Sequence, residues 1–165
     1  PSLGIAVCMG DRGSALEEAN AVLEEYRRTL TKYLNWLMEP NTERVEELNN
    51  VYVVRGGGVI DDKVIGAVSS ILSTNLAKPE KPIIAYSLVS GENLAKISAR
   101  AIDPVVRKGL NLGEILRVAA ERHLGKGGGH NIAAGAQVPI QELESFVKLV
   151  DELVKEHLGA SVGGR

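Results

Sequence analysis

The longest regular pattern of apolar positions runs from residue 14 to about residue 38. These positions alternate in steps of three and four: Leu16, Ala19, Leu23, Tyr26, Leu30, Tyr33 and Leu37. The spacing predicts one long amphipathic helix that begins near Ser14 and ends before Pro40. Three heptads are short for a coiled coil, so we expect this helix to lie on another body, within this chain or outside it. A short apolar helix over residues 2–9 precedes it, and a linker or short helix follows from Asn41.

Shorter strand-like and helix-like segments alternate after residue 50. Strands are predicted at 51–54, 82–89, 94–101 and 133–138, and helices at about 61–73, 111–124 and 139–158. The second and third strands flank a turn sequence at Ser90–Asn93, which predicts an antiparallel hairpin. This alternation predicts an α/β fold: a mixed sheet of about four to five strands flanked by helices, with a long N-terminal connector helix. We expect the tail, residues 160–165, to be disordered.

One predicted strand carries an unusual polar face. Alternation with period two places Lys96, Ser98 and Arg100 on the same side of the strand over 94–101. This face is either a solvent-facing edge of the sheet or a polar platform beneath a phosphate. Arginine suits the second role because its guanidinium can grip two oxygens at once.

The glycine-rich stretch over residues 125–136 is the main candidate site. Lys126 is followed by Gly127, Gly128 and Gly129, then by His130, and then by small residues. Glycines leave the backbone open to a ligand, and their N–H groups can line a concavity that favours an anion such as phosphate. Lys126 adds a positive charge and His130 a hydrogen-bond donor. The alternative is an ordinary flexible loop between a helix and a strand.

A second glycine run follows Arg55, over residues 56–58. It lacks a histidine and a strand of small residues. Arg55 is therefore a secondary candidate for approaching the ligand, and the alternative is a simple turn at the end of a strand.

Composition narrows the class of protein. The chain has 165 residues, 44% of them hydrophobic, which suits one domain and an appendage. No apolar run approaches the ~20 residues needed to span a bilayer, and no signal peptide is recognisable. Cys8 is the single cysteine, which suits a reducing cytoplasm. The first residue is Pro1, so we expect a fragment of a longer protein.

Charge is unevenly distributed although the net charge is only −2. Between residues 96 and 130 there are seven basic and three acidic residues, whereas the rest of the chain is acidic. Positive charge therefore concentrates around the glycine stretch, as expected for a site that meets phosphates.

Two motifs resemble a known family, the DHH-associated C-terminal domain of the DHH phosphoesterases, in particular RecJ-like single-strand nucleases. The motifs are Gly128-Gly129-His130 followed by Ala133-Ala134-Gly135, and Ser98-Ala99-Arg100 on the strand after the hairpin. The helix start at 64–66 and the long helix at 14–38 also match. Two departures, Val59–Lys63 in place of a Trp-His-Pro-Gly motif and Ala101 in place of a serine, suggest a divergent, archaeal-type branch.

The resemblance implies a division of the chain and of the chemistry. Residues 1–48 would connect to a catalytic domain outside this chain, and residues 49–159 would form the substrate-binding domain. The family holds two Mn²⁺ or Mg²⁺ ions in its catalytic half with Asp-His-His and further aspartates. This chain has no Asp-His pair, and its histidines show no metal-ligand spacing. We therefore expect neither a metal nor catalysis from this chain alone.

The resemblance also implies roles for the candidate residues and partners. The backbone over 126–129 would cradle a phosphate of a single-stranded nucleic acid or nucleotide. Arg100 and His130 would donate to phosphate oxygens, Ser98 would add a hydroxyl, and Lys96 positive potential. Other partners implied are the protein's own catalytic domain and the replication complex GINS. Two alternatives stay open: a protein-interaction module that docks through the long helix, and an accessory domain of the alanyl-tRNA synthetase type.

Overall fold

The computed structural model describes residues 2–75 and 80–160. The chain divides into two compact units, residues 1–36 and 37–165. The first unit contains helix α1 (Ser2–Cys8) and nearly all of α2 (Ser14–Leu37). Both helices were predicted, and α2 ends three residues before Pro40 as its sequence requires.

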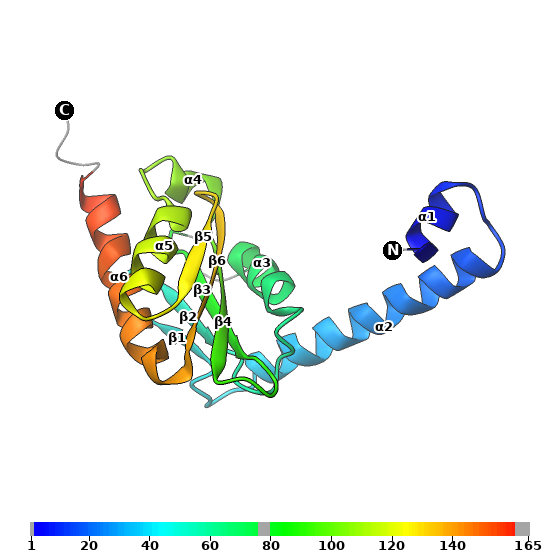
Figure 1. Cartoon of the computed structure of the whole chain (residues 1–165), viewed down its shortest axis with the longest axis horizontal. Coiled ribbons are helices and arrows are strands. Elements are labelled where there is room, and N and C mark those ends of the chain that lie inside the picture. Colours follow the sequence, from blue (N-terminus) through cyan, green and yellow to red (C-terminus); the bar gives the residue numbers. More distant parts are fainter. Residues whose placement is uncertain (1, 76–79, 161–165) are drawn as a thin grey trace. The chain divides into compact units, whose positions relative to one another are not determined.

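The second unit is built around one mixed sheet (Figure 1). The strands are β1 (Val45–Glu47), β2 (Tyr52–Arg55), β3 (Ile83–Leu88), β4 (Leu94–Arg100), β5 (Lys126–Gly129) and β6 (Ala133–Pro139). Their order across the sheet is β1-β2-β3-β4-β6-β5. Only the β2–β3 pair is parallel, and the crossover between these strands contains helix α3 (Ile65–Asn75). The mixed α/β fold predicted from the sequence is confirmed.

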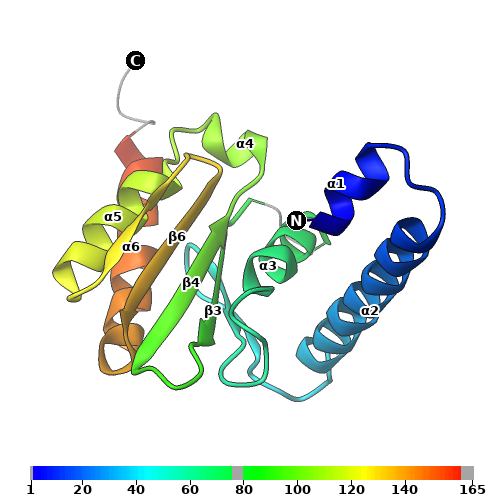
Figure 2. The same cartoon turned by 45° about the vertical axis from the view of Figure 1, so that its right-hand side comes forward.

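Helices cover the two faces of the sheet unequally. Helix α3 contacts β3 and β4 on one face. On the other face lie α5 (Leu112–Arg122), which packs on β5 and β6, and α6 (Leu143–Ala160), which packs on α5 (Figures 1 and 2). The short helices α4 (Asp103–Val106) and η1 (Ile140–Glu142) precede α5 and α6. The exposed glycine and glutamine at positions 135 and 137 show that the α3 face of β6 is open.

The hydrophobic core lies between the sheet and the α5–α6 layer. Phe146, Val150 and Val154 on α6 recur at steps of four and are fully buried. They belong to one cluster with Leu116 of α5 and Ile97 of β4. This core fixes which face of β4 is inward, because the residues that alternate with Ile97 must point to the opposite face.

Local sequence signals explain where α5 begins and ends. Asn111 caps the helix, and its side-chain oxygen accepts a hydrogen bond of 3.2 Å from the Glu114 amide. The helix ends at Arg122, two residues before the predicted end. Leu124 adopts the left-handed conformation that closes the helix, with φ of 56°. Gly125 is needed for space, since a Cβ there would lie 2.2 Å from the Gln137 carbonyl oxygen.

Three further features differ from the sequence prediction. The sheet has six strands, not four to five, because β1 falls in the expected linker and β5 in the expected glycine loop. Helix α4 was not predicted. Helix α6 continues to Ala160, and residues 161–165 of the expected disordered tail lie outside the described residues.

Candidate nucleic-acid site on the open face of the sheet

The open face of β4, β6 and β5 gathers the candidate residues into rows across the sheet. Lys96 is paired in register with Gln137, and Gln137 with Lys126. In the next row Ser98 is paired with Gly135 and Gly135 with Gly128; Arg100 is paired with Ala133. Residues directly opposite one another in a sheet point to the same face. Lys96, Ser98, Arg100, Gln137 and Lys126 therefore share one face, as predicted for the first three.

A cavity of about 350 Å³ lies between this face and the start of α3. The side chains of Lys96, Ser98 and Arg100 line it from β4, together with Gly128 and Gly129 of β5. Its remaining lining residues come from the loop before α3 and the start of α3, from β4 and from β6: Asp62, Lys63, Ile65, Gly66, Ile97, Ala133, Ala134 and Gly135. The cavity thus joins the two motifs, which are about 30 residues apart in the sequence.

Arg100 is the central charged group of the cavity. Its guanidinium donates to the Ser70 hydroxyl through Nε at 2.9 Å and to the Ala99 carbonyl through Nη1 at 2.8 Å. Both partners are neutral, and no carboxylate pairs with Arg100 in the part of the chain that the structure describes. Burial lowers the pKa of the Arg100 guanidinium, because a desolvated cation is disfavoured. A partly buried cation without a counter-charge favours an incoming anion.

The start of α3 faces Arg100 and Ser98. A Cβ built on Gly66 would lie 3.6 Å from Arg100 Nη2 and 3.7 Å from Ser98 Oγ, so the helix backbone passes close to both side chains. The first turn of a helix has backbone N–H groups without partners inside the helix, and the helix dipole makes this end positive. In the 11-residue α3, this end opens into the same cavity as Arg100. The two features together favour an anion.

Ser98 is tied to α3 by a buried hydrogen bond. Its Oγ lies 3.0 Å from Ser69 Oγ, and Ser69 itself donates to the Gly66 carbonyl at 3.0 Å. Ser69 has one hydroxyl proton, so Ser98 must donate in their shared bond. Ser98 then has only acceptor capacity left. Its contact locks α3 against β4, whereas the family resemblance implied that Ser98 offers a hydroxyl to the ligand.

The three glycines of β5 are favoured at their positions for different structural reasons. A Cβ on Gly127 would lie 2.5 Å from the Leu116 carbonyl, and one on Gly113 of α5 would lie 2.3 Å from the Gly129 carbonyl. Helix and strand therefore touch through their backbones. Gly128 and Gly129 have φ of 153° and 145°, values that favour glycine. The space beside Gly128 is open, since a Cβ there would meet nothing within 4 Å.

The predicted glycine loop is therefore an edge strand, because β5 is last in the sheet order. An edge strand presents alternate backbone N–H groups away from its single neighbour. Without side chains these groups can be approached closely, so the expected cradle of backbone donors is compatible with a strand.

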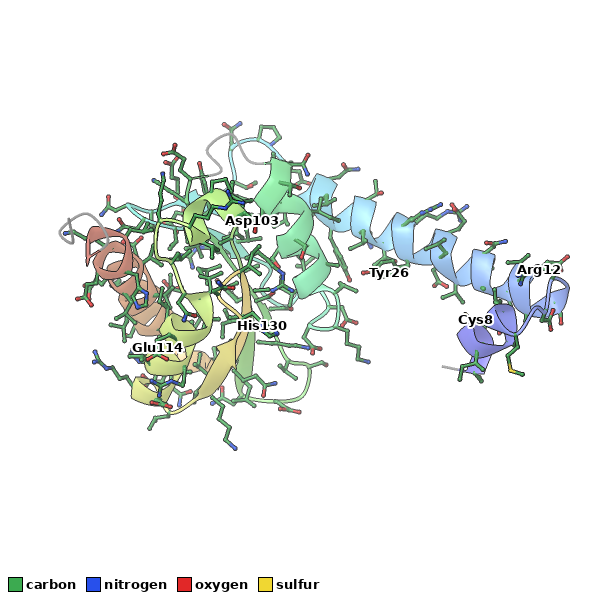
Figure 3. The ribbon with its side chains drawn as sticks, turned by 90° about the horizontal axis from the view of Figure 1, so that it is seen from above. Cys8, Arg12, Tyr26, Asp103, Glu114 and His130 are labelled. Carbon is green, nitrogen blue, oxygen red and sulfur yellow. The ribbon has the colours of Figure 1, made fainter. Side chains whose placement is uncertain are left out.

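The other predicted site residues differ in whether they line this cavity, a neighbouring one or neither. His130 is exposed where β5 turns into β6 (Figure 3). It is not among the residues that line the cavity. Its amide donates to the Ala133 carbonyl at 2.8 Å. Lys126 and Gly127 line a neighbouring cavity. Lys96 reaches both cavities, and its Nζ lies 3.3 Å from Asp62 Oδ2.

The structure does not bring Arg55 into this group. Its guanidinium pairs with Glu144 at 2.7 Å and Glu46 at 2.8 Å, and it donates to the Tyr86 hydroxyl at 3.2 Å. These hydrogen bonds, that to Glu144 first, raise the pKa of Arg55 further above its ordinary range. Arg55 therefore joins β2 to β1 and α6 and has its charge compensated within the domain.

Five residues around this cavity and its neighbour had no predicted role in ligand binding: Gly66, Ser69, Ser70, Gly135 and Gln137. Alternation along the last strand could have placed Gly135 and Gln137 on one face. Nothing in the sequence indicated that α3 would lie against Lys96, Ser98 and Arg100, because that packing joins segments about 30 residues apart.

Within residues 2–75 and 80–160, no group of three or more His, Cys, Asp or Glu residues could hold a metal ion. The residues described thus do not fit the metal pair expected for the catalytic half of the resembling family. None of the described helices is long and apolar enough to cross a membrane.

Comparison with known proteins agrees with this fold and these motifs. The DHHA1 domain family model matches residues 49–156. The uncharacterized protein MJ0831 of Methanocaldococcus jannaschii is 34% identical over 157 residues, which are 95% of this chain and 32% of that protein. The chain therefore spans about a third of the length of this relative.

Solved structures share the fold at low sequence identity. RecJ of Thermus thermophilus in complex with Mn²⁺ is 19% identical, with a TM-score of 0.60 over 94% of this chain and 22% of that one. The C-Ala domain of Aquifex aeolicus alanyl-tRNA synthetase is 15% identical, with a TM-score of 0.53 over 67% of this chain and 96% of that one. Since the family model covers more than half of its length, the chain belongs to the DHHA1 domain family, the DHH-associated family that its motifs resemble.

Proposed function

We propose that the open face of the sheet binds a phosphate group of a single-stranded nucleic acid or nucleotide. In this proposal the chain is the substrate-binding part of a DHH phosphoesterase whose catalytic part lies outside it. The observation that carries the proposal is Arg100, a partly buried guanidinium with only neutral partners, which lines a cavity beside the start of α3.

The surroundings of Arg100 supply further donors for a phosphate. Backbone N–H groups approach the cavity from the first turn of α3 and from the edge strand β5. Gly66, Gly128 and Gly135 keep the walls free of side chains. Lys96 and Lys63 add two positive charges, against one negative charge from Asp62. The net potential of the cavity is therefore positive, which favours an anion and its approach.

The kind of ligand is argued from composition and from similar proteins. Aromatic residues make up 4% of the chain, too few for extensive base stacking, so recognition of the sugar-phosphate backbone is favoured. Two similar structures come from proteins whose names refer to nucleic acid, the exonuclease RecJ and an alanyl-tRNA synthetase. The likeness itself concerns the fold, so these names only support the choice of ligand to test.

Fluorescence anisotropy with a short labelled single-stranded DNA tests the proposal. The parent protein at low salt should bind, and Arg100→Ala should weaken binding by at least about tenfold, since hydrogen bonds to charged groups contribute about 1.5–3 kcal/mol. His130→Ala should weaken binding less, because His130 lies outside the cavity. Arg122→Ala is the matched control: it removes the same charge from an exposed position on α5.

Three outcomes would contradict the proposal. They are absence of binding by the parent at low salt, an Arg100→Ala variant that binds as tightly as the parent, and an Arg122→Ala variant that is weakened as much as Arg100→Ala. A separate titration with a tRNA tests the alternative of an accessory domain of the alanyl-tRNA synthetase type. Preference for tRNA over single-stranded DNA would favour a role of the alanyl-tRNA synthetase type.

We further propose that hydrolysis requires the catalytic domain outside this chain, with Mn²⁺ or Mg²⁺ bound there. The chain alone, incubated with a labelled single strand and Mn²⁺, should leave the strand intact. Cleavage that persists through further purification of the protein would contradict this part of the proposal.

A second candidate function concerns α2. Val22, Leu23 and Tyr26 of this helix are exposed apolar side chains. Such a group favours docking of another protein surface, which could be the catalytic domain or a replication partner such as GINS. Charged substitutions at Leu23 and Leu30 should abolish capture of purified GINS, whereas Arg100→Ala should not affect it. Capture that survives both charged substitutions would exclude this docking mode.

A further inference from the structure

We infer that the open face carries a second phosphate subsite, formed by Lys96, Gln137 and Lys126, so that the ligand is a strand with at least two phosphates. This inference rests on the proposed function, because the first subsite is the cavity around Arg100. It assigns a role to Gln137, which was not among the site residues predicted from the sequence.

The first observation is a second cavity next to the first. Its volume is about 400 Å³, and Lys96, Lys126 and Gln137 line it together with Gly127 and Ala136. It shares Lys96, Ile97 and Gly135 with the cavity around Arg100. The two cavities therefore continue into each other along the sheet, and one ligand can occupy both.

The second observation is the arrangement of the three side chains. Gln137 of β6 is in register with Lys96 on one side and with Lys126 on the other. The Gln137 side chain thus starts between the side chains of two lysines in one row across three strands. Neither Lys126 nor Gln137 has a side-chain hydrogen bond or ion pair with any residue that the structure describes. Both are exposed, so their donors are available to a ligand.

The third observation is the spacing of the rows. The row of Lys96, Gln137 and Lys126 lies two residues along the strands from the row of Ser98, Gly135 and Gly128. Two residues of an antiparallel strand span about 7 Å. This distance is of the same order as the separation of successive phosphates in an extended single strand. Arg100 is two residues further along β4, so its row lies about 14 Å from that of Lys96, a span that the lengths of the Arg100 and Lys96 side chains can shorten. The two subsites can therefore hold neighbouring phosphates of one strand.

The charges of the second cavity also favour an anion. Lys126 brings a cation with no counter-charge among the described residues. Lys96 forms an ion pair with Asp62, with 3.3 Å between Nζ and Oδ2. The floor between them is formed by small residues, Gly127, Gly135 and Ala136, so a phosphate can reach the amide of Gln137. A nucleoside monophosphate would fill the first subsite only.

Three ligands separate the two subsites in a calorimetric titration of the 165-residue chain: pT, with one phosphate; pTpT, with two; and pTpT with a neutral methylphosphonate linkage. The last has the same bases and sugars as pTpT but lacks the second charge. We expect pTpT to bind about tenfold more tightly than its methylphosphonate analogue, as for one set of charge-assisted hydrogen bonds.

Variants assign the difference to residues. In the double variant Lys126→Ala with Gln137→Ala, pTpT and its analogue should bind equally, and pT should bind as to the parent. Arg100→Ala should weaken all three ligands. Lys148→Ala is the matched control, because it removes an exposed lysine from α6, on the other face of the sheet.

Failure of this inference is distinguishable from failure of the proposed function. If the parent binds pT and pTpT but does not distinguish pTpT from its analogue, the second subsite is wrong and the first stands. The same holds if the double variant weakens pT as much as pTpT. If the parent binds none of the three ligands, both proposals are overturned.

Discussion

Arg100 combines a binding role with an electrostatic cost to the fold. Its charge is partly buried, and its hydrogen-bond partners among the described residues are a hydroxyl and a carbonyl. Functional sites often keep such groups at the expense of stability. We therefore expect Arg100→Met, which keeps an unbranched apolar stem in place of the arginine stem but removes the charge, to leave the free energy of unfolding unchanged or to raise it by up to about 1 kcal/mol.

Urea unfolding and nucleic-acid binding of Arg100→Met should thus move independently. Binding should fall as it does for Arg100→Ala. A loss of about 2 kcal/mol or more in the free energy of unfolding would show instead that the hydrogen bonds to Ser70 and Ala99 hold the domain together.

Leu124 is a second residue whose local geometry makes a prediction. It has φ of 56°, a left-handed conformation that is unfavourable for any residue with a Cβ, and it is 78% exposed. Leu124→Gly should relieve this strain with little loss of packing. The free energy of unfolding should rise by about 0.5–1 kcal/mol. Leu124→Ala is the control, since it removes the apolar surface but keeps the strain; equal stabilisation by both variants would contradict the argument.

Residue-level patterns predicted part of the site. Alternation along β4 placed Lys96, Ser98 and Arg100 on one face, and the structure confirms this. The partners of Arg100 and Ser98, Ser70 and Ser69, could not be predicted, because they come from α3 through tertiary packing. Likewise, a sequence cannot reveal that Arg55 is neutralised by Glu144, which is 89 residues away.

At the scale of elements, the unexpected strands have clear physical reasons. Strand β1 has three residues, Val45–Glu47, too few for a periodic signal. Strand β5 contains three glycines, which are depleted in strands and indicate a loop. It forms because β6 provides a ladder on one side and α5 a backbone contact behind it. Long periodic helices and the β3–β4 hairpin were predicted, since their signals are local.

Alanine substitutions of two glycines test the structure of this sheet, because they should affect the free energy of unfolding differently. Gly127→Ala would place a Cβ 2.5 Å from the Leu116 carbonyl, so β5 and α5 must move apart. We expect this substitution to lower the free energy of unfolding by about 1–3 kcal/mol. Gly135→Ala meets its nearest atom at 3.5 Å and should leave stability unchanged or slightly higher.

For nucleic-acid binding, in contrast to stability, Gly135→Ala should be the variant with the direct effect. The new methyl group of Gly135→Ala lies on the floor of the cavity, between Ser98 and Gly128, and should weaken nucleic-acid binding. Unfolding curves and anisotropy titrations of both variants check the pair. A destabilised Gly135→Ala variant, or a Gly127→Ala variant as stable as the parent, would contradict the assigned faces.

At the scale of the whole molecule, the site and the core belong to one unit. The residues of the hydrophobic cluster run from Val51 to Val154, and the cavity residues from Asp62 to Gln137. Residues 37–165 should therefore fold and bind without the first unit. We expect circular dichroism to show one cooperative transition, with a midpoint within about 5 °C of that of the full chain. Loss of cooperativity on removal of residues 1–36 would contradict this expectation.

The central claim is the location of the binding face, and NMR tests it most directly. A ¹⁵N-labelled sample of the chain would be titrated with a short single-stranded DNA at low salt. The largest amide shifts should fall on Gly66, Gly128 and Gly129, on 98–100 of β4 and on 135–137 of β6. Saturating addition with no shifts there, or with the largest shifts around Lys148 and Asp151 on α6, would contradict the account.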